Sequence, residues 1–149
     1  LDKIHDCTID FIATHPPYAN IITYTKDKKL EDDLSQLPFG EFIDGMKATA
    51  RESFRVLKPG KTCAILIGDT RKHKHYVPIA FQVMEVFLDC GFVLKEDIIK
   101  IQWNMKGTRE NWKGKEYDFY LIEHEHIFVF EKPLDEREIK KYRFSSKWW

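Results

Sequence analysis

The sequence is short of cysteine, of net charge and of long apolar runs. Its three cysteines, Cys7, Cys63 and Cys90, lie far apart and form no CxxC pair, which argues against a disulfide framework or a zinc cluster and favours a reducing, cytoplasmic compartment. The 24 basic residues equal the 24 acidic ones, so any surface for nucleic acid has to be a local patch. No apolar run approaches the roughly 18 residues that span a bilayer, and we expect neither a signal peptide nor a membrane contact.

The 149 residues, of which 43% are hydrophobic, suffice for one domain with a packed core. Short apolar runs alternate with segments of helical periodicity, which predicts an α/β fold with parallel strands and crossover helices. The last two strands are joined by a polar loop without a helix, so we expect them to pair antiparallel. The expected strands are 8–14, 62–68, 92–102 and 120–130, and the expected helices are 41–57 and 78–90.

The first expected strand runs directly into the segment Thr14-His15-Pro16-Pro17-Tyr18. Proline has no backbone N–H and fixes its own φ, so the strand ends in stiff, extended backbone whose carbonyls lack ladder partners. Those carbonyls, beside the Tyr18 ring, can hold a flat group that carries an exocyclic amine. Ligands of open α/β sheets bind beyond the carboxyl ends of the strands, where this segment lies. The alternative is a rigid structural turn with buried prolines.

Three motifs in order resemble one enzyme family over about residues 8–133. His15-Pro16-Pro17-Tyr18 is similar to the (Asp/Asn/Ser)-Pro-Pro-(Tyr/Phe/Trp) motif of amino-group DNA methyltransferases, which methylate N6 of adenine or N4 of cytosine with S-adenosylmethionine. The segment 55–60, Arg-Val-Leu-Lys-Pro-Gly, resembles the turn before the next strand of that family. The segment 126–132, His-Ile-Phe-Val-Phe-Glu-Lys, resembles its late strand.

The resemblance implies a partial, Rossmann-like class I methyltransferase fold. Residues 1–133 would form the catalytic-motif, C-terminal half of the domain, and residues 134–149 would form a charged tail. Two features depart from the family: His15 stands where Asp, Asn or Ser is usual, and no glycine-rich cofactor turn follows an early strand. Because the chain begins at Leu1 almost directly in a strand, we expect a fragment whose cofactor half comes from a missing N-terminal segment or a partner chain.

The family's chemistry assigns a role to each residue of the motif. An exocyclic amine is a poor nucleophile, and two acceptors aimed at its N–H groups would make the nitrogen lone pair available for the sulfonium methyl group. Transferred here, those acceptors are the side chain of His15 and the carbonyl of Pro16. Pro17 is the second proline of the catalytic motif. Tyr18 would stack on a base flipped out of the duplex. A protonated His15 would offer only donors, so activity should fall in acid. Thr14 and His15 are the expected contacts for S-adenosylmethionine.

Other candidate site residues lie in or beside three expected loops: 19–36, the basic loop 69–76 and the polar loop 104–117. Tyr24, in the loop 19–36, either closes over the substrate or belongs to a solvated loop, and Asp69 either contacts the substrate or shapes its own loop. Basic residues interleaved with tryptophan suit nucleic-acid contact, although an ordinary surface hairpin is the alternative for the loop near residue 110. The candidate nucleic-acid contacts are Arg71, Lys72, Lys74, Trp103, Lys106, Arg109, Trp112 and Lys113.

Two histidine-containing segments resemble metal sites only superficially. The pair His73 and His75 has no acidic or cysteine partner nearby in the sequence, and the residues 123–126 alternate faces on a strand, so we expect them to be edge-strand charges and expect no metal. The main prediction is a DNA methyltransferase. An RNA amine methyltransferase and a non-catalytic, methyltransferase-like nucleic-acid-binding module remain as alternatives.

Overall fold

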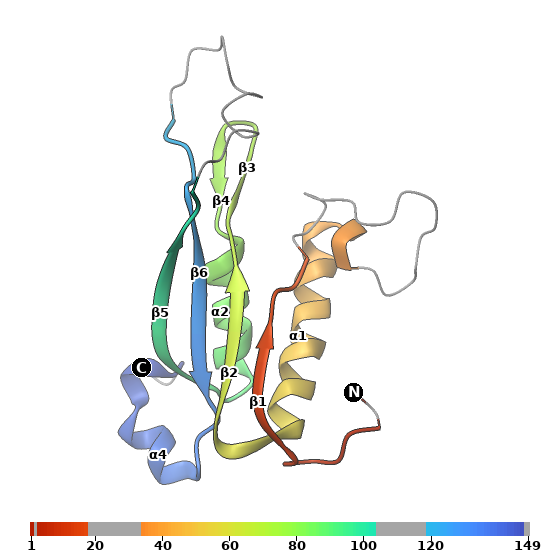
Figure 1. Ribbon diagram of the computed structural model, residues 1–149, viewed down its shortest axis with the longest axis vertical. Coiled ribbons are helices and arrows are strands. Elements are labelled where there is room, and N and C mark those ends of the chain that lie inside the picture. The colour runs from red at the N-terminus through yellow and green to blue at the C-terminus, as the bar shows by residue number, and fades with distance from the viewer. Residues whose placement is uncertain (2, 18–33, 104–118, 148–149) are drawn as a thin grey trace.

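The computed structural model describes residues 1, 3–17, 34–103 and 119–147, which form a four-stranded sheet with helices on one face (Figure 1). The strands are β1 (Ile9–Thr14), β2 (Leu57–Ile67), β5 (Val93–Ile101) and β6 (His124–Glu131), in the order β1-β2-β6-β5. β1 is parallel to β2, and β6 runs antiparallel to both β2 and β5. The prediction of parallel strands followed by a final antiparallel strand is confirmed.

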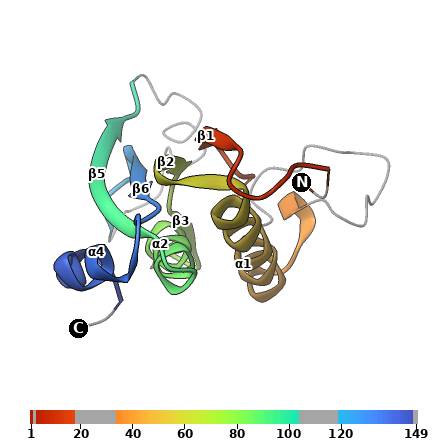
Figure 2. The same ribbon diagram turned by 90° about the horizontal axis from the view of Figure 1, so that it is seen from below.

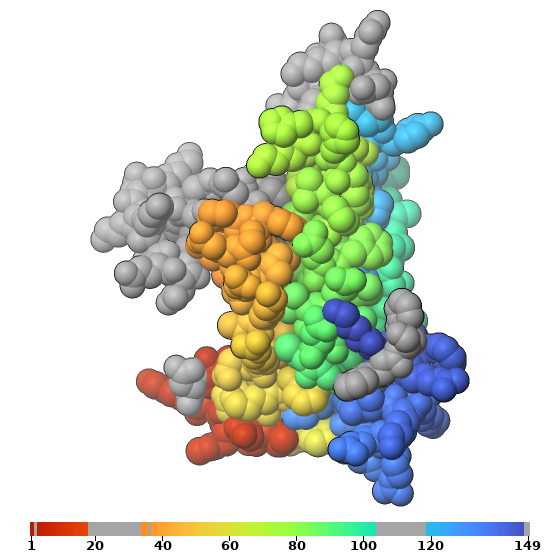
Figure 3. Space-filling model, turned by 180° about the vertical axis from the view of Figure 1, so that it is seen from behind, coloured from red at the N-terminus to blue at the C-terminus, as the bar shows by residue number. Residues whose placement is uncertain are grey.

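Two helices, α1 (Phe39–Val56) and α2 (Ile79–Asp89), cover the same face of the sheet (Figure 2). Figure 3 looks onto this helical face, where the two helices run side by side. Helical spacing brings Phe42, Met46 and Ala50 onto the buried face of α1. They pack with alternate residues of the strands, among them Ile65 and Phe128. No helix of the described residues is long and apolar enough to cross a membrane.

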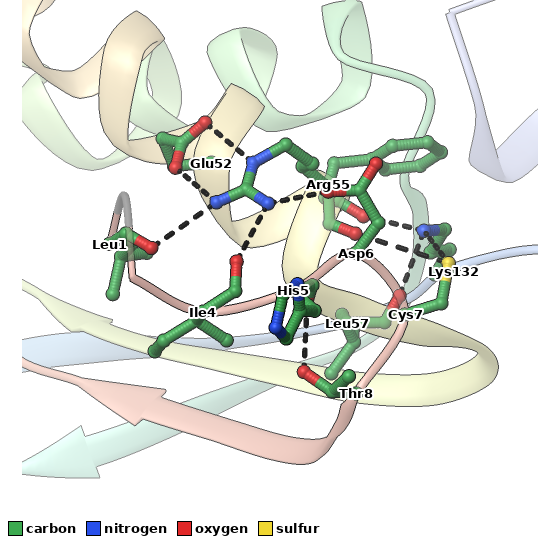
Figure 4. Close-up of polar contacts among 11 residues, drawn as sticks. Leu1, Ile4, His5, Asp6, Cys7, Thr8, Glu52, Arg55, Leu57 and Lys132 are labelled. Atoms are coloured by element: carbon green, nitrogen blue, oxygen red, sulfur yellow. Dashed lines mark hydrogen bonds and ion pairs between the residues drawn. The ribbon is translucent and has the colours of Figure 1, made fainter.

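The carboxyl end of α1 is completed by a buried lysine far along the chain. The last four carbonyls of a helix have no partner within it. Lys132 is 8% exposed, and its Nζ donates to the carbonyl of Phe54 at 2.6 Å and to that of Leu57 at 2.8 Å (Figure 4). The ammonium also lies 4.6 Å from the centre of the Phe54 ring. A positive charge here also suits the negative end of the helix dipole.

The segment before β1 closes the remaining carbonyls of α1. The backbone N–H of Cys7 donates to Arg55 and that of Thr8 donates to Val56, at 3.0 and 2.9 Å. The Arg55 side chain binds Glu52 and Asp6, at 2.8 and 2.5 Å, and reaches the carbonyl of Ile4 at 2.9 Å (Figure 4). These hydrogen bonds raise the pKa of the Arg55 guanidinium above its usual range. The start of the motif-bearing strand is therefore fixed to the end of α1.

Several segments differ from the sequence-based expectation, among them β6, which begins at His124 rather than at the expected residue 120. Residues expected as a basic loop form a hairpin of β3 (Thr70–Lys72) and β4 (His75–Val77). Part of the charged tail forms the short helix α4 (Glu136–Lys141), whose first N–H groups are capped by the Asp135 carboxylate. β2 begins directly after α1, at Leu57 rather than at the expected residue 62. Two 3₁₀ turns, Leu34–Gln36 and Arg143–Ser145, complete the described elements.

Gly60 lies in the irregular part of β2, between its paired residues Leu57 and Thr62, and contacts the residue that follows β6. Its φ is +73°, and its N–H donates to the Lys132 carbonyl at 2.7 Å. We predict that Gly60→Ala lowers the free energy of unfolding by about 1–2 kcal/mol, because a left-handed conformation places Cβ too close to the backbone. Gly40→Ala is the matched control: it lies in α1 with open space at its Cβ position, so urea denaturation should show unchanged or higher stability. Equal effects at both positions would contradict this explanation.

Candidate functional site

The Pro-Pro segment lies at the carboxyl edge of the sheet, as expected for a ligand site. Thr14 is the last residue of β1 in register with β2, where it pairs with Ile65. His15 is exposed, Pro16 is buried and Pro17 is half-buried. Pro16 thus anchors the segment in the protein while the His15 side chain reaches solvent. Tyr18 and Tyr24 lie outside the described residues.

Asp69, which follows β2 at the same edge, holds the hairpin to α2. Its side chain is 1% exposed. Oδ1 accepts the backbone N–H of Ala80 at 2.7 Å, in the first turn of α2, and Oδ2 accepts a short hydrogen bond from the hydroxyl of Tyr76. Partial burial and then the bond to Asp69 raise the pKa of the Tyr76 phenol, which keeps it protonated as a donor. Because the side chain is almost fully buried, direct contact of Asp69 with a substrate would require the hairpin or the start of α2 to move.

The β3–β4 hairpin stands beyond the carboxyl ends of β1 and β2 (Figure 1). Its tip residues His73 and Lys74 have φ values of +51° and +69°, as in the type I′ turns that join two paired strands. Neither is glycine or asparagine, so the turn carries backbone strain that the strands on either side must offset. The tip projects Lys72, His73 and His75 as exposed basic side chains. Strained backbone of this kind is found preferentially at functional sites.

Arg71 fixes this hairpin to the chain that leads into β6. Its Nε and Nη2 donate to the carbonyl of Tyr120 at 3.1 and 2.6 Å, and its Nη1 donates to the carbonyl of Lys74 at 3.1 Å. The guanidinium also lies 4.7 Å from the centre of the Phe119 ring. Arg71 therefore stabilises the hairpin through its own hydrogen bonds. Lys72 is exposed, so its ammonium is more accessible to a phosphate than the Arg71 guanidinium.

The acidic and histidine residues of β6 are not edge charges, so that prediction is wrong. β6 lies between β2 and β5, and both Glu125 and His126 are buried. The two side chains alternate faces as expected: Glu125 pairs with Lys100, and His126 faces the helical side, where it meets Asp97. Charges on β5 that complement those on β6, such as Lys100 opposite Glu125, indicate that these two strands pair, but they do not show that β6 also pairs with β2. The part of the chain that the structure describes holds no cluster of three metal-ligating side chains.

The second proposed nucleic-acid surface lies mostly outside the described residues. Trp103 follows the end of β5 and is 93% exposed. Because β5 runs in the same direction as β2, this residue lies toward the carboxyl edge of the sheet, where the hairpin follows β2. Lys106, Arg109, Trp112 and Lys113 fall in the segment that the structure does not describe.

Comparison with known proteins gives one family and one fold. The sequence pattern of the N6/N4 type DNA methylase family matches residues 9–149. A curated relative, the orphan methyltransferase M.BamHII of Bacillus amyloliquefaciens, is 27% identical over 131 residues, which are 88% of this chain and 41% of that protein. The chain thus spans about two fifths of the length of this relative.

Solved structures of DNA methyltransferases share the fold. The cytosine-N4-specific PvuII DNA methyltransferase superposes with a TM-score of 0.68 at 19% identity, covering 89% of this chain and 45% of that one. A Thermus thermophilus protein assigned as a DNA modification methylase, in complex with S-adenosyl-L-methionine, gives a TM-score of 0.64 at 19% identity, with 94% and 56% covered. The match over 9–149 shows that this chain belongs to the DNA methylase family of the N6/N4 type.

Proposed function

We propose that this chain is the catalytic-motif half of an S-adenosylmethionine-dependent methyltransferase that acts on N6 of adenine or N4 of cytosine in DNA. The observation that carries the proposal is the position of His15-Pro16-Pro17 at the carboxyl edge of β1, with Pro16 buried and His15 exposed. Family membership supports the reaction type, and the PvuII enzyme, which shares the fold, is cytosine-N4-specific.

The motif residues would act on the amine of a flipped base. A neutral His15 ring offers one acceptor nitrogen, and the Pro16 carbonyl offers a second acceptor one residue later. Together they would bind both N–H groups of the amine and direct its lone pair away from the base. The rigid prolines hold these acceptors in place, so little ordering remains to be done when the base arrives. Tyr18 would stack on the base.

The described residues supply only one side of a cofactor site. Thr14 and His15 end the strand at which the amine and the methyl group would meet. However, no glycine-rich strand-to-helix turn occurs among the described segments to cradle S-adenosylmethionine, which would supply the methyl group when bound. The remaining contacts must therefore come from elsewhere in the protein or from a partner chain.

The sheet offers a docking place for such a second half. Within the described residues, the outer edge of β1 pairs with no strand and the face opposite α1 and α2 is covered by no helix (Figure 2). This open face carries apolar side chains: Phe11 is 59% exposed, and further along the sheet the paired residues Leu66 and Ile127 are half-buried. Since the chain spans 41–56% of the relatives above, we propose that the part of the protein corresponding to their remainder covers this face and edge.

The hairpin is the proposed DNA contact. We predict that Lys72→Ala weakens binding to all DNA sequences alike and reduces the slope of log affinity against log salt by about 1, because one phosphate contact is lost. Fluorescence anisotropy at several salt concentrations measures both effects. Lys140→Ala, which removes an exposed lysine from α4 at the opposite end of the sheet, is the charge-matched control and should change neither. Equal losses for the two variants would contradict a local contact.

Methyl transfer by the full-length reading frame tests the whole proposal. Labelled S-adenosylmethionine is supplied with DNA and, separately, with RNA, and the nucleosides are separated after digestion. Label in N6-methyladenine or N4-methylcytosine from DNA supports the proposal and identifies the base. Label from RNA alone would mean that the substrate is RNA and not DNA. No label in either polymer, with the protein folded, would favour the non-catalytic binding module.

A further inference from the structure

The imidazole of His126 is buried between two carboxylates. Its side chain is 6% exposed and packs against Phe81 of α2 and Phe128 of β6, with ring centres 5.2 Å away in both cases. Nδ1 lies 3.0 and 3.2 Å from the two carboxylate oxygens of Asp97 on β5. Nε2 is 3.8 Å from Oδ2 of Asp69 and makes no hydrogen bond, alone among the buried side-chain nitrogens and oxygens of the described residues.

A neutral ring does not explain this arrangement. With its single proton on Nδ1, toward Asp97, the ring would point the Nε2 lone pair at the Asp69 carboxylate. Two acceptors would then face each other between side chains that are 6% and 1% exposed, which is costly at a buried site. A ring protonated on both nitrogens instead donates a charge-assisted hydrogen bond to Asp97 at 3.0 Å and attracts the Asp69 carboxylate as an ion pair at 3.8 Å.

Within the described residues, the other groups around the ring add no fixed positive charge that would oppose a doubly protonated imidazole. β5 contributes Asp97, the link from β2 to β3 contributes Asp69, and α2 contributes the uncharged Phe81. β4 acts through the Tyr76 hydroxyl, which donates to Asp69, and β6 itself contributes the His124 ring at 5.2 Å. Asp69 already receives hydrogen bonds from Tyr76 and Ala80, so a donor on Nε2 would fix the same carboxylate from a third side.

We propose that His126 is a positioning residue that bears a proton on both ring nitrogens, joins Asp97 to Asp69 and thereby fixes the base of the β3–β4 hairpin. Asp69 then holds Tyr76 of the hairpin through one carboxylate oxygen and the first turn of α2 through the other. The consequence for DNA binding rests on the proposed function. The consequence for the hairpin's stability does not, so the two can be tested apart.

The protonation state is measured by nitrogen NMR of the histidine side chains in the full-length protein at neutral pH, with His126→Gln identifying the signal. Two protonated-type ring nitrogens are the expected result. One protonated and one bare nitrogen would overturn the proposal.

Hydrogen exchange of the amides 70–77 should be faster in His126→Phe, which keeps the ring packing but has no donor. It should be largely restored in His126→Gln, whose amide N–H can reach toward Asp69. Unchanged exchange in His126→Phe would also overturn it.

The kinetic test asks whether His126 acts through the hairpin. His126→Phe should raise KM for DNA about tenfold with a smaller change in kcat, the size expected for one lost charge-assisted hydrogen bond. Tyr76→Phe should do the same, and the double variant should be no worse than either single one, because both break one chain of contacts. Additive losses in the double variant would count against the proposal. If the wild type binds no DNA, the proposed function fails, and the NMR and exchange results still decide this inference.

Discussion

Replacing Lys132 by methionine should lower the free energy of unfolding by about 2–6 kcal/mol. Methionine is similar in length to the lysine side chain but donates no hydrogen bond. The carbonyls of Phe54 and Leu57 then stay buried without a partner, which costs about 1–3 kcal/mol each. The loss is a large part of the roughly 5–15 kcal/mol that stabilises a typical domain. Urea denaturation followed by circular dichroism measures it.

Lys61→Met provides the control for this experiment. Lys61 is a nearby lysine that is about half exposed and pairs with Asp10 at 3.5 Å. Surface ion pairs contribute little, so we expect a change of less than about 1 kcal/mol. If Lys132→Met were as mild as Lys61→Met, Lys132 would not be completing the end of α1.

Replacing His15 by alanine should lower kcat/KM for methyl transfer by about 100-fold or more, the scale seen when one preorganised hydrogen bond to a reacting group is removed. The side chain is exposed and its loss leaves no cavity, so thermal stability should stay within about 0.5 kcal/mol of the wild type. Single-turnover assays with saturating S-adenosylmethionine separate the chemical step from binding.

Two further variants make the His15 experiment specific. His15→Asn keeps an acceptor as a carbonyl oxygen, and we expect it to retain most activity, including in acid, where a protonated histidine ring would lose its acceptor. His5→Ala removes another exposed histidine, at the opposite end of β1, and should change nothing. Wild-type rates in His15→Ala, or an equally inactive His15→Asn, would remove His15 from the proposed chemistry.

The main elements of the fold could be predicted from the sequence because their signals are strong and local. The spacing of Phe42, Met46 and Ala50 predicts α1, and the continuous apolar run in β2 predicts a strand covered on both faces, of which α1 and α2 cover one within the described residues. The hairpin could not be predicted, because His73 and Lys74 lack the glycine or asparagine that marks such turns. It is also held by Arg71, whose partner Tyr120 lies 49 residues further along the chain.

The candidate site is predictable only where its chemistry is carried by one contiguous motif. The Pro-Pro segment could be placed at the sheet edge from the sequence, and the roles of its residues stay predictions. His126 and Lys132 resemble surface charges because the sequence around them is rich in Glu and Lys. Their burial depends on β6 lying between β2 and β5, and the position of a strand within a sheet follows from long-range pairing that local patterns do not encode.

The strand order also has a consequence for biosynthesis. β5 leaves the ribosome before β6, although β6 is its partner in the sheet. The inner edge of β2 also stays unpaired until β6 is made. Until residues 124–131 emerge, both strands carry unpaired edges that invite pairing with other chains. Closure of the sheet depends on contacts between residues far apart in sequence, which slows folding. A nascent chain arrested before His124 would therefore be the form of this protein most prone to aggregate.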